Sequence, residues 1–185
     1  PPVDLSRLEP NNLESEDFYC AFSRFVPYKR LDLAISACKK LNKKLVVIGD
    51  GSNRKQLEAI AKDCDFIKFT GRISDEEVKK YLQRCKALIF CAEEDFGIIP
   101  LEAQACGRPV IAFKKGGALE TVIENKTGVF FDKQETDNVC NAILNFETLY
   151  NQNVFNTNKI VEHAKTFSIE SFKKQIMDVI NENSN

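Results

Sequence analysis

Short apolar, β-prone runs alternate with stretches of helical periodicity over most of this chain. In residues 30–41, for example, apolar side chains recur at the three- and four-residue spacing of a helix. Strict alternation of strands and helices is the pattern of a parallel sheet with crossover helices on both faces. The sequence therefore predicts an α/β, doubly wound sheet with six parallel strands, at residues 18–23, 44–49, 67–70, 87–91, 109–113 and 128–131.

The helices are expected between these strands and, after residue 132, in an unbroken series to the end of the chain. Ser74, followed three residues later by Glu77, forms the pattern of a capping box and predicts a helix start. A length of 185 residues suits a single domain. The predicted helices are residues 30–41, 54–63, 75–84, 98–106, 118–123, 135–149, 157–166 and 169–183, and residues 152–185 are expected to be C-terminal helices.

The bulk composition excludes several classes of protein. A formal net charge of −1 gives no reason to expect nucleic acid as a partner. No apolar run approaches the roughly 18 residues of a membrane-spanning helix, and no secretory signal is present. Seven cysteines without a Cys-x-x-Cys spacing indicate reduced core residues in a cytoplasmic protein rather than a disulfide framework or a metal cluster.

Two glutamates separated by seven residues, Glu94 and Glu102, bracket the passage from the fourth predicted strand into a helix. Glu94 is expected on the loop and Glu102 in the first turns of the helix. A helix N-terminus presents free N–H groups and a partial positive charge, which suits a phosphate. Carboxylates on either side of a phosphate accept hydrogen bonds from sugar hydroxyls. A nucleotide-sugar has hydroxyls on both sides of its diphosphate, so it is the expected ligand.

The segment from Glu94 to Ala112 reads Glu-Asp-Phe-Gly-Ile-Ile-Pro-Leu-Glu-Ala-Gln-Ala-Cys-Gly-Arg-Pro-Val-Ile-Ala. It resembles the donor-site signature of retaining glycosyltransferases of family GT4, and the resemblance extends from residue 1 to about residue 174. These enzymes have the GT-B architecture, in which two Rossmann-like domains face a cleft. The amino-acid sequence of this segment is most similar to that of a branch of bacterial and archaeal mannosyltransferases that make surface polysaccharides.

The resemblance implies that the chain is the C-terminal, donor-binding half of a larger enzyme. Residues 1–16 then correspond to a remnant of the inter-domain linker, and the acceptor site lies in an N-terminal domain that is missing here. The implied partners are a nucleotide-diphospho-sugar donor and that second domain. Neither a cofactor nor a metal is expected. The implied location is the cytoplasm, with at most a peripheral association of the full enzyme with the inner face of the membrane.

Two cations follow the first predicted strand, Arg24 and Lys29. Ligands of a doubly wound sheet bind beyond the carboxyl ends of its strands, so both side chains are expected at the correct edge. A guanidinium holds a diphosphate by a fork of hydrogen bonds, and an ammonium holds it as a point charge. The family has a matching Arg and Lys pair, which supports the prediction that these two residues bind the diphosphate.

The remaining donor-binding residues are expected on other loops at this edge. Gly49 and Gly51 follow the second strand and predict a tight turn at the border of the nucleotide cleft. The resemblance places Ile73 against the nucleotide base and the Gly116-Gly117 loop beside the donor. The segment between the two glutamates supplies Phe96 as a further donor-binding residue, and Gly97, Ile98 and Ile99, whose backbone N–H groups are expected to face the diphosphate.

Several other features favour simpler explanations. Glu93 adjoins Glu94, but the seven-residue spacing selects Glu94. Residues 49–54 lack the third glycine of a dinucleotide-binding fingerprint, which argues against NAD. Asp63 and Asp65 have the Asp-x-Asp spacing of a metal site but are expected at the opposite edge, in a helix-ending turn. The only histidine, His163, is far in sequence from the donor loops and is expected at the surface or at a helix end.

The expected function is retaining, metal-independent transfer of a hexosyl group to a glycan or lipid-linked acceptor. Arg24, Lys29 and Glu94 are the expected catalytic residues: the two cations neutralise the leaving diphosphate and Glu94 binds the transferred sugar. Glu102 is expected to bind the ribose. The branch resemblance suggests GDP-mannose as the donor. Two alternatives stay open, a non-catalytic nucleotide-sugar-binding module and a GT-B sugar-nucleotide epimerase.

Overall fold

The computed structural model describes residues 2–11 and 14–182 and contains a six-stranded, wholly parallel sheet with the strand order β3-β2-β1-β4-β5-β6. Its bounds agree with the predicted strands to within two residues. The doubly wound fold is therefore confirmed. The strands are β1 (Tyr19–Phe22), β2 (Leu45–Ile48), β3 (Ile67–Gly71), β4 (Ala87–Phe90), β5 (Val110–Phe113) and β6 (Gly128–Phe131).

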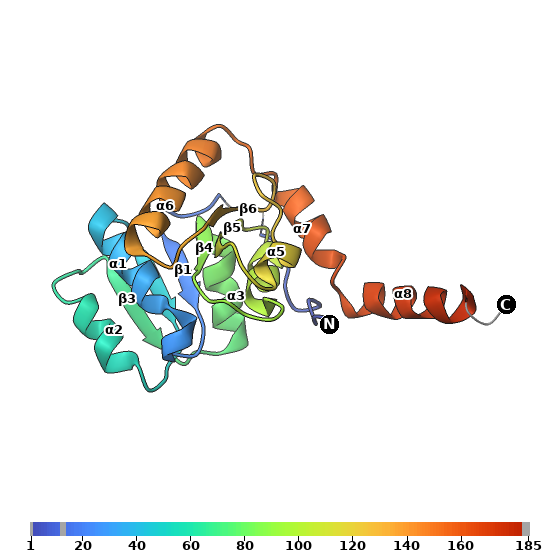
Figure 1. Ribbon diagram of the computed structural model, residues 1–185, viewed down its shortest axis with the longest axis horizontal. Helices are drawn as coiled ribbons and strands as arrows, with labels where there is room; N and C mark the ends of the chain where they lie inside the picture. The colour runs from blue at the N-terminus through green and yellow to red at the C-terminus, as the bar shows by residue number, and fades with distance from the viewer. Residues whose placement is uncertain (1, 12–13, 183–185) are drawn as a thin grey trace.

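Helices cover both faces of the sheet (Figure 1). One apolar cluster joins the sheet to α1 (Leu31–Leu41), α2 (Arg54–Ile60) and α6 (Thr136–Asn151). A second cluster, on the other face, joins it to α3 (Asp75–Arg84), α4 (Ile98–Ala105) and α5 (Ala118–Thr121). Because each strand is buried from both sides, its sequence is a continuous apolar run rather than an alternating one.

Several helix boundaries differ from the prediction by one to three residues. Helix α1 starts at Leu31 because Arg30 has a left-handed backbone (φ 50°, ψ 36°). Helix α2 stops at Ile60, and Asp63 turns the chain with a φ of 66°. Helix α6 runs two residues further than expected, to Asn151. The capping box at Ser74 and Glu77 is confirmed, with both of its hydrogen bonds present.

The last two helices leave the body of the domain in different ways. Helix α7 (Thr157–Lys165) packs on α4, where Ala164 meets Leu101 and Ala105. Helix α8 (Ile169–Glu182) projects away from the sheet in Figure 1; the expected final residue, Asn183, lies outside the described residues. Within the described part of the chain, no helix has the length and apolar content required to cross a membrane.

The position of the site follows from the centre of the sheet. Strands β1 and β4 are neighbours, and the strand order reverses between them. The chain leaves β1 towards α1 on one face and leaves β4 towards α4 on the other. The two loops therefore diverge and open a crevice beyond the carboxyl ends of the strands, which is where doubly wound sheets bind their ligands.

Candidate donor site

The loop from β4 into α4 has the geometry that the sequence predicts. Gly97 is the residue before the helix and adopts a left-handed backbone (φ 87°, ψ 58°) that an L side chain rarely adopts. No side chain caps the first turn of α4, so its N–H groups stay available for an anion. Glu94 lies on the loop and Glu102 lies inside the helix, as expected.

Lys29 and Glu94 meet across the ends of β1 and β4. The ammonium of Lys29 forms an ion pair with the carboxylate of Glu94, and the two side chains are only 13% and 19% exposed. Both line a hollow of about 340 Å³ together with Phe96, Gly97 and Ile98. Glu93 lines the same hollow but is exposed. The structure thus brings the lysine, the loop glutamate and the start of α4 together.

Arg24 lies in a neighbouring hollow of about 360 Å³, with Gly49 and Ile73. Arg24 is exposed, and in the described part of the chain it makes no ion pair with a carboxylate. Arg72 adds a second cation to this hollow. The predicted base-binding residue and the predicted phosphate-binding arginine therefore share one concave surface.

Glu102 does not face the hollow that Glu94 lines. It borders a third hollow of about 200 Å³, with Arg7 and Asp75. The pKa of Glu102 is raised to about 7, mainly by burial and also by the negative charge of Asp75, while the positive charge of Arg7 opposes the shift. The four residues that the sequence places at one edge of the sheet are thus distributed over three hollows: Lys29 and Glu94 share one, Arg24 lines the second and Glu102 lines the third.

The three hollows nevertheless lie along one edge of the sheet. The second and third share Phe22 and Val78 in their walls. Arg24 and Lys29 are on one loop, and Glu94 and Glu102 flank the start of α4. Sequence reasoning missed Arg7 and Asp75; Asp75 could have been found from its place two residues after Ile73, whereas nothing in the pattern around Arg7 indicated its position.

The glycine loops pack tightly against the site loops. A Cβ on Gly116 would lie 2.3 Å from the carbonyl oxygen of Glu94, and one on Gly117 would lie 2.2 Å from the backbone of Phe96. Gly49 has a φ of 128° and would contact Ser23, while Gly51 would contact Phe25. Gly49 lines the hollow of Arg24, but Gly51 lines none of the three. The role of Gly51 is thus close packing against the loop that carries Arg24 and Lys29.

The apolar residues of the donor segment point in different directions. Ile98 is 48% exposed at the hollow. Ile99 is half-buried and packs into the core under the sheet. Phe96 contacts Phe167 edge-to-face, with 5.9 Å between the ring centroids. Only the backbone of Ile99 is therefore placed near the predicted diphosphate position, whereas Phe96 and Ile98 also line the hollow with their side chains.

His163 contacts residues next to the donor segment, although it lies far from that segment in sequence. It lies in the last turn of α7, half-buried, and its Nε2 is 3.1 Å from the carbonyl oxygen of Thr121 at the end of α5. Its ring also contacts Phe167, which in turn contacts Phe96. The expected helix-end position is confirmed, and the packing of α7 on α4 brings this residue close to α5 although it is far from the donor loops in sequence.

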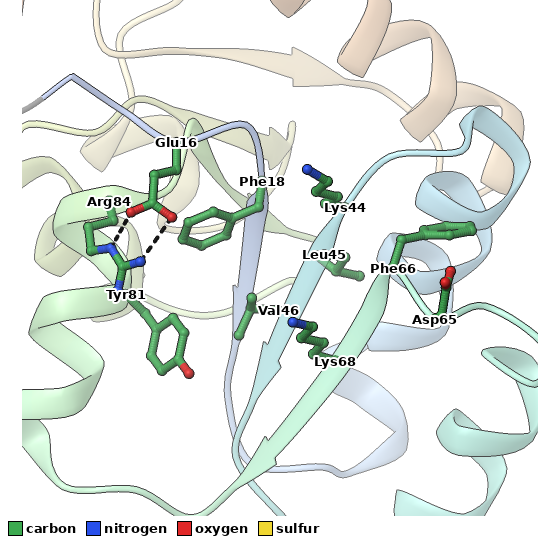
Figure 2. A pocket seen from close by; sticks show the side chains of 10 residues that line it. All are labelled: Glu16, Phe18, Lys44, Leu45, Val46, Asp65, Phe66, Lys68, Tyr81 and Arg84. Atoms are coloured by element: carbon green, nitrogen blue, oxygen red, sulfur yellow. Dashed lines mark hydrogen bonds and ion pairs between the residues drawn. The ribbon is translucent and has the colours of Figure 1, made fainter.

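A hollow of about 600 Å³, larger than the three at the donor edge, lies at the opposite edge of the sheet (Figure 2). Its walls include Phe18, Tyr81 and the ion pair of Glu16 with Arg84. None of the predicted donor residues borders it. Asp65 does, so the Asp-x-Asp pair belongs to this amino edge, as expected. Among the described residues, no group of three or more His, Cys, Asp or Glu side chains is placed to hold a metal ion.

Comparison with known proteins identifies the family. The model of "Glycosyl transferases group 1" matches residues 6–165. This chain belongs to the group 1 glycosyltransferase family. An uncharacterized glycosyltransferase of Methanocaldococcus jannaschii is 33% identical over 159 residues, which are 84% of this chain and 44% of that protein.

Two further proteins resemble the chain, one in sequence and one in fold. A GDP-mannose-dependent alpha-(1-6)-phosphatidylinositol monomannoside mannosyltransferase of Mycobacterium tuberculosis is 31% identical over 172 residues, covering 77% of this chain and 44% of that protein. The crystal structure of HepE from Anabaena with UDP and glucose superimposes with a TM-score of 0.82 at 20% identity, over 98% of this chain and 55% of HepE. This glycosyltransferase chain thus spans about half the length of the curated relatives it matches.

Proposed function

We propose that the chain is the donor-binding half of a retaining GT4 glycosyltransferase. It binds a nucleotide-diphospho-sugar along the carboxyl edge of the sheet and supports metal-independent transfer of a hexosyl group to a glycan or lipid-linked acceptor. The missing half of the enzyme supplies the acceptor site. A lipid-linked acceptor would bring the full enzyme to the inner face of the cell membrane from the cytoplasm.

The observation that carries the proposal is the convergence of Lys29, Glu94 and the uncapped start of α4 on one hollow. An ammonium and a set of free N–H groups are donors for a diphosphate, and a carboxylate beside them accepts hydrogen bonds from sugar hydroxyls. A half-buried ion pair also keeps Lys29 in place before the ligand arrives. This combination suits a ligand that carries sugar and phosphate side by side.

The other residues bind the remaining parts of the ligand along the carboxyl edge of the sheet. Arg24 supports the diphosphate from the neighbouring hollow, where Ile73 and Gly49 receive the base. Glu102 takes the ribose hydroxyls in the hollow that it shares with Arg7 and Asp75. As the glycosidic bond breaks, charge grows on the leaving diphosphate, and preorganised donors stabilise it. One well-placed donor contributes about 3–4 kcal/mol to such a transition state.

GDP-mannose is the donor that we favour. The mycobacterial relative is named GDP-mannose-dependent, and it is 31% identical over most of this chain. The HepE structure contains UDP, but at 20% identity it shows only that the fold is shared. The affinities of the chain for nucleotides with different bases are therefore the first quantities to measure.

Calorimetric titration of the chain with UDP, GDP, ADP and their sugars tests the proposal directly. We expect one diphosphate nucleotide and its sugar to bind, with weaker binding in Arg24→Ala and in Glu102→Ala. Lys126→Ala, an exposed lysine outside the three hollows, is the matched charge control. The proposal fails if no nucleotide binds, or if the site variants bind as tightly as the control.

The two alternative functions need the full enzyme. In a transferase, Glu94→Ala abolishes transfer of the sugar to an acceptor, whereas a non-catalytic module shows no transfer to lose. An epimerase releases a free nucleotide-sugar with an inverted centre, which product analysis by NMR would identify.

A further inference from the structure

A chain of polar contacts joins three loops at the carboxyl edge of the sheet. The guanidinium of Arg30 holds the carboxylate of Asp32, with Nη2 and Oδ2 3.1 Å apart. Its Nη1 lies 3.4 Å from Oε1 of Gln134. The amide nitrogen of Gln134 then donates a 2.8 Å hydrogen bond to the carbonyl oxygen of Cys91. We call this series of contacts, from Arg30 through Gln134 to the Cys91 carbonyl, the Gln134 clamp.

The clamp connects the two segments that carry the candidate ion pair. Arg30 directly follows Lys29, and Cys91 precedes Glu94 by three residues. Gln134 comes from the loop between β6 and α6, and β5 lies between β6 and β4 in the sheet. Its side chain therefore reaches past the neighbouring strand to the end of β4. A single amide thus bridges the loop after β1 and the loop after β4.

Arg30 requires such support because of its backbone. Its left-handed conformation is uncommon for a residue with a side chain and persists only where surrounding contacts hold it. The clamp and Asp32 supply those contacts. The same left-handed residue ends the short helical turn Pro27–Lys29 and starts α1, so it sets the direction in which Lys29 leaves the loop.

The clamp lies outside the hollow that the donor would fill. None of its three residues lines the hollow of Lys29 and Glu94. A bound diphosphate competes with Glu94 for the ammonium of Lys29, so the direct contact between the two loops weakens when the donor binds. The clamp has no such competitor. It is therefore suited to hold the loops at a constant separation in the free and the bound protein.

We propose that Gln134 is a positioning residue for the donor site: through Arg30 and the Cys91 carbonyl it fixes Lys29 relative to Glu94. This inference rests on the proposed function for its consequence in binding. Its structural part, the coupling of the two loops, is independent of any ligand. The two parts are tested by separate measurements on the same variants.

The structural part is tested by amide NMR of Gln134→Met, which keeps the approximate length of the side chain and removes both polar atoms. Gln152→Met is the matched control, because Gln152 is exposed at the end of α6 and far from the clamp in the chain. We expect shifted or faster-exchanging amides at residues 29–32 and 91–94 in Gln134→Met alone. Unchanged amides in either segment would overturn the proposal.

The functional part is tested by calorimetry with a nucleoside monophosphate, its diphosphate and its diphospho-sugar. Lys29 and Glu94 are assigned to the distal phosphate and the sugar, so Gln134→Met should weaken the diphospho-sugar about three- to tenfold, as for the loss of one hydrogen bond. The monophosphate should bind unchanged. An equal loss for all three ligands would indicate general damage and would overturn the positioning role.

Gln134→Glu separates the two halves of the clamp. A glutamate still accepts from Arg30, but it has no donor for the Cys91 carbonyl. If Gln134→Glu binds the diphospho-sugar as weakly as Gln134→Met does, the result supports the full clamp. If it binds as tightly as the unaltered chain, the role of the Cys91 carbonyl is overturned. If the unaltered chain binds no nucleotide at all, the proposed function fails, and the amide measurements still decide whether Gln134 couples the loops.

Discussion

The backbone N–H of Gly117 donates a 2.7 Å hydrogen bond to the carbonyl oxygen of Glu94. This bond fastens the loop after β5 to the loop after β4. Gly117 packs so closely against Phe96 that a Cβ would lie 2.2 Å from three backbone atoms of Phe96. Its backbone has ordinary helical angles (φ −62°), so the constraint on this glycine is contact rather than conformation.

Gly117→Ala is therefore expected to destabilise the domain by about 1–3 kcal/mol, the usual result of forcing a methyl group into a packed position. Urea unfolding followed by circular dichroism measures the change. Ser52→Ala, at an exposed turn, is the control with a change of similar size. Equal urea midpoints for the two variants would show that the two loops move apart to admit the methyl group without loss of stability.

Lys29→Met is expected to weaken binding of a nucleoside diphosphate about 10- to 100-fold, as for the loss of a hydrogen bond to a charged group. It also leaves Glu94 half-buried without its cation. Because the lost interaction is ionic, the difference from the unaltered chain should shrink as salt rises. Calorimetry at two ionic strengths measures it. Lys126→Met, in an exposed turn, should bind normally.

Glu102 makes the stability of the domain depend on pH in an unusual direction. Its pKa is about 7 in the folded protein against an ordinary value of 4.5. Between these values the folded state binds the extra proton, so the free energy of unfolding falls as pH rises through that window. The total change is of the order of 2–3 kcal/mol. Chemical unfolding of the unaltered chain and of Glu102→Gln, between about pH 5 and pH 8, compares the slopes. A slope that Glu102→Gln leaves unchanged would refute this assignment.

His163 makes the stability of the domain depend on pH in the direction opposite to that of Glu102. Its burial lowers the pKa below the ordinary 6.5, although the hydrogen bond to Thr121 opposes the shift. The folded state then binds fewer protons than the unfolded chain, so acidification below about pH 6.5 removes stability. Since His163 is the only histidine, a proton NMR titration of its ring reports the pKa directly. An apparent pKa at or above 6.5 would contradict the burial argument.

Glu147 anchors α6 at the amino edge of the sheet. Its carboxylate accepts from the hydroxyl of Tyr19 at 2.9 Å and from the ammonium of Lys43 at 2.7 Å. Glu147→Ala should lower the free energy of unfolding by about 1–3 kcal/mol, because both donors lose their partner in a half-buried place. Lys40→Ala, which breaks an exposed ion pair with Asp137, should cost at most about 1 kcal/mol. Thermal or urea unfolding compares the two.

Much of the fold could be predicted because it depends on patterns that are local in sequence. The apolar runs, the Ser74–Glu77 capping box and the Gly97 turn into α4 all have signals within a few residues. The seven-residue spacing placed Glu94 on the loop and Glu102 on the helix for the same reason. Of the two adjacent glutamates, Glu94 forms the ion pair with Lys29, and its role in binding the sugar stays a prediction.

The relations between distant segments depended on the tertiary structure. The angle at which α4 leaves its loop sends Glu102 to a different hollow from Glu94 and brings it to Asp75 and Arg7. The packing of α7 on α4 brings His163 to Thr121, and the strand order brings Gln134 to Cys91. The sequence by itself determined which elements form and which edge of the sheet carries the site, because hydrophobic periodicity and turn chemistry act over a few residues. Packing between elements far apart in the chain decided which side chains share a hollow. Local sequence patterns do not predict such packing.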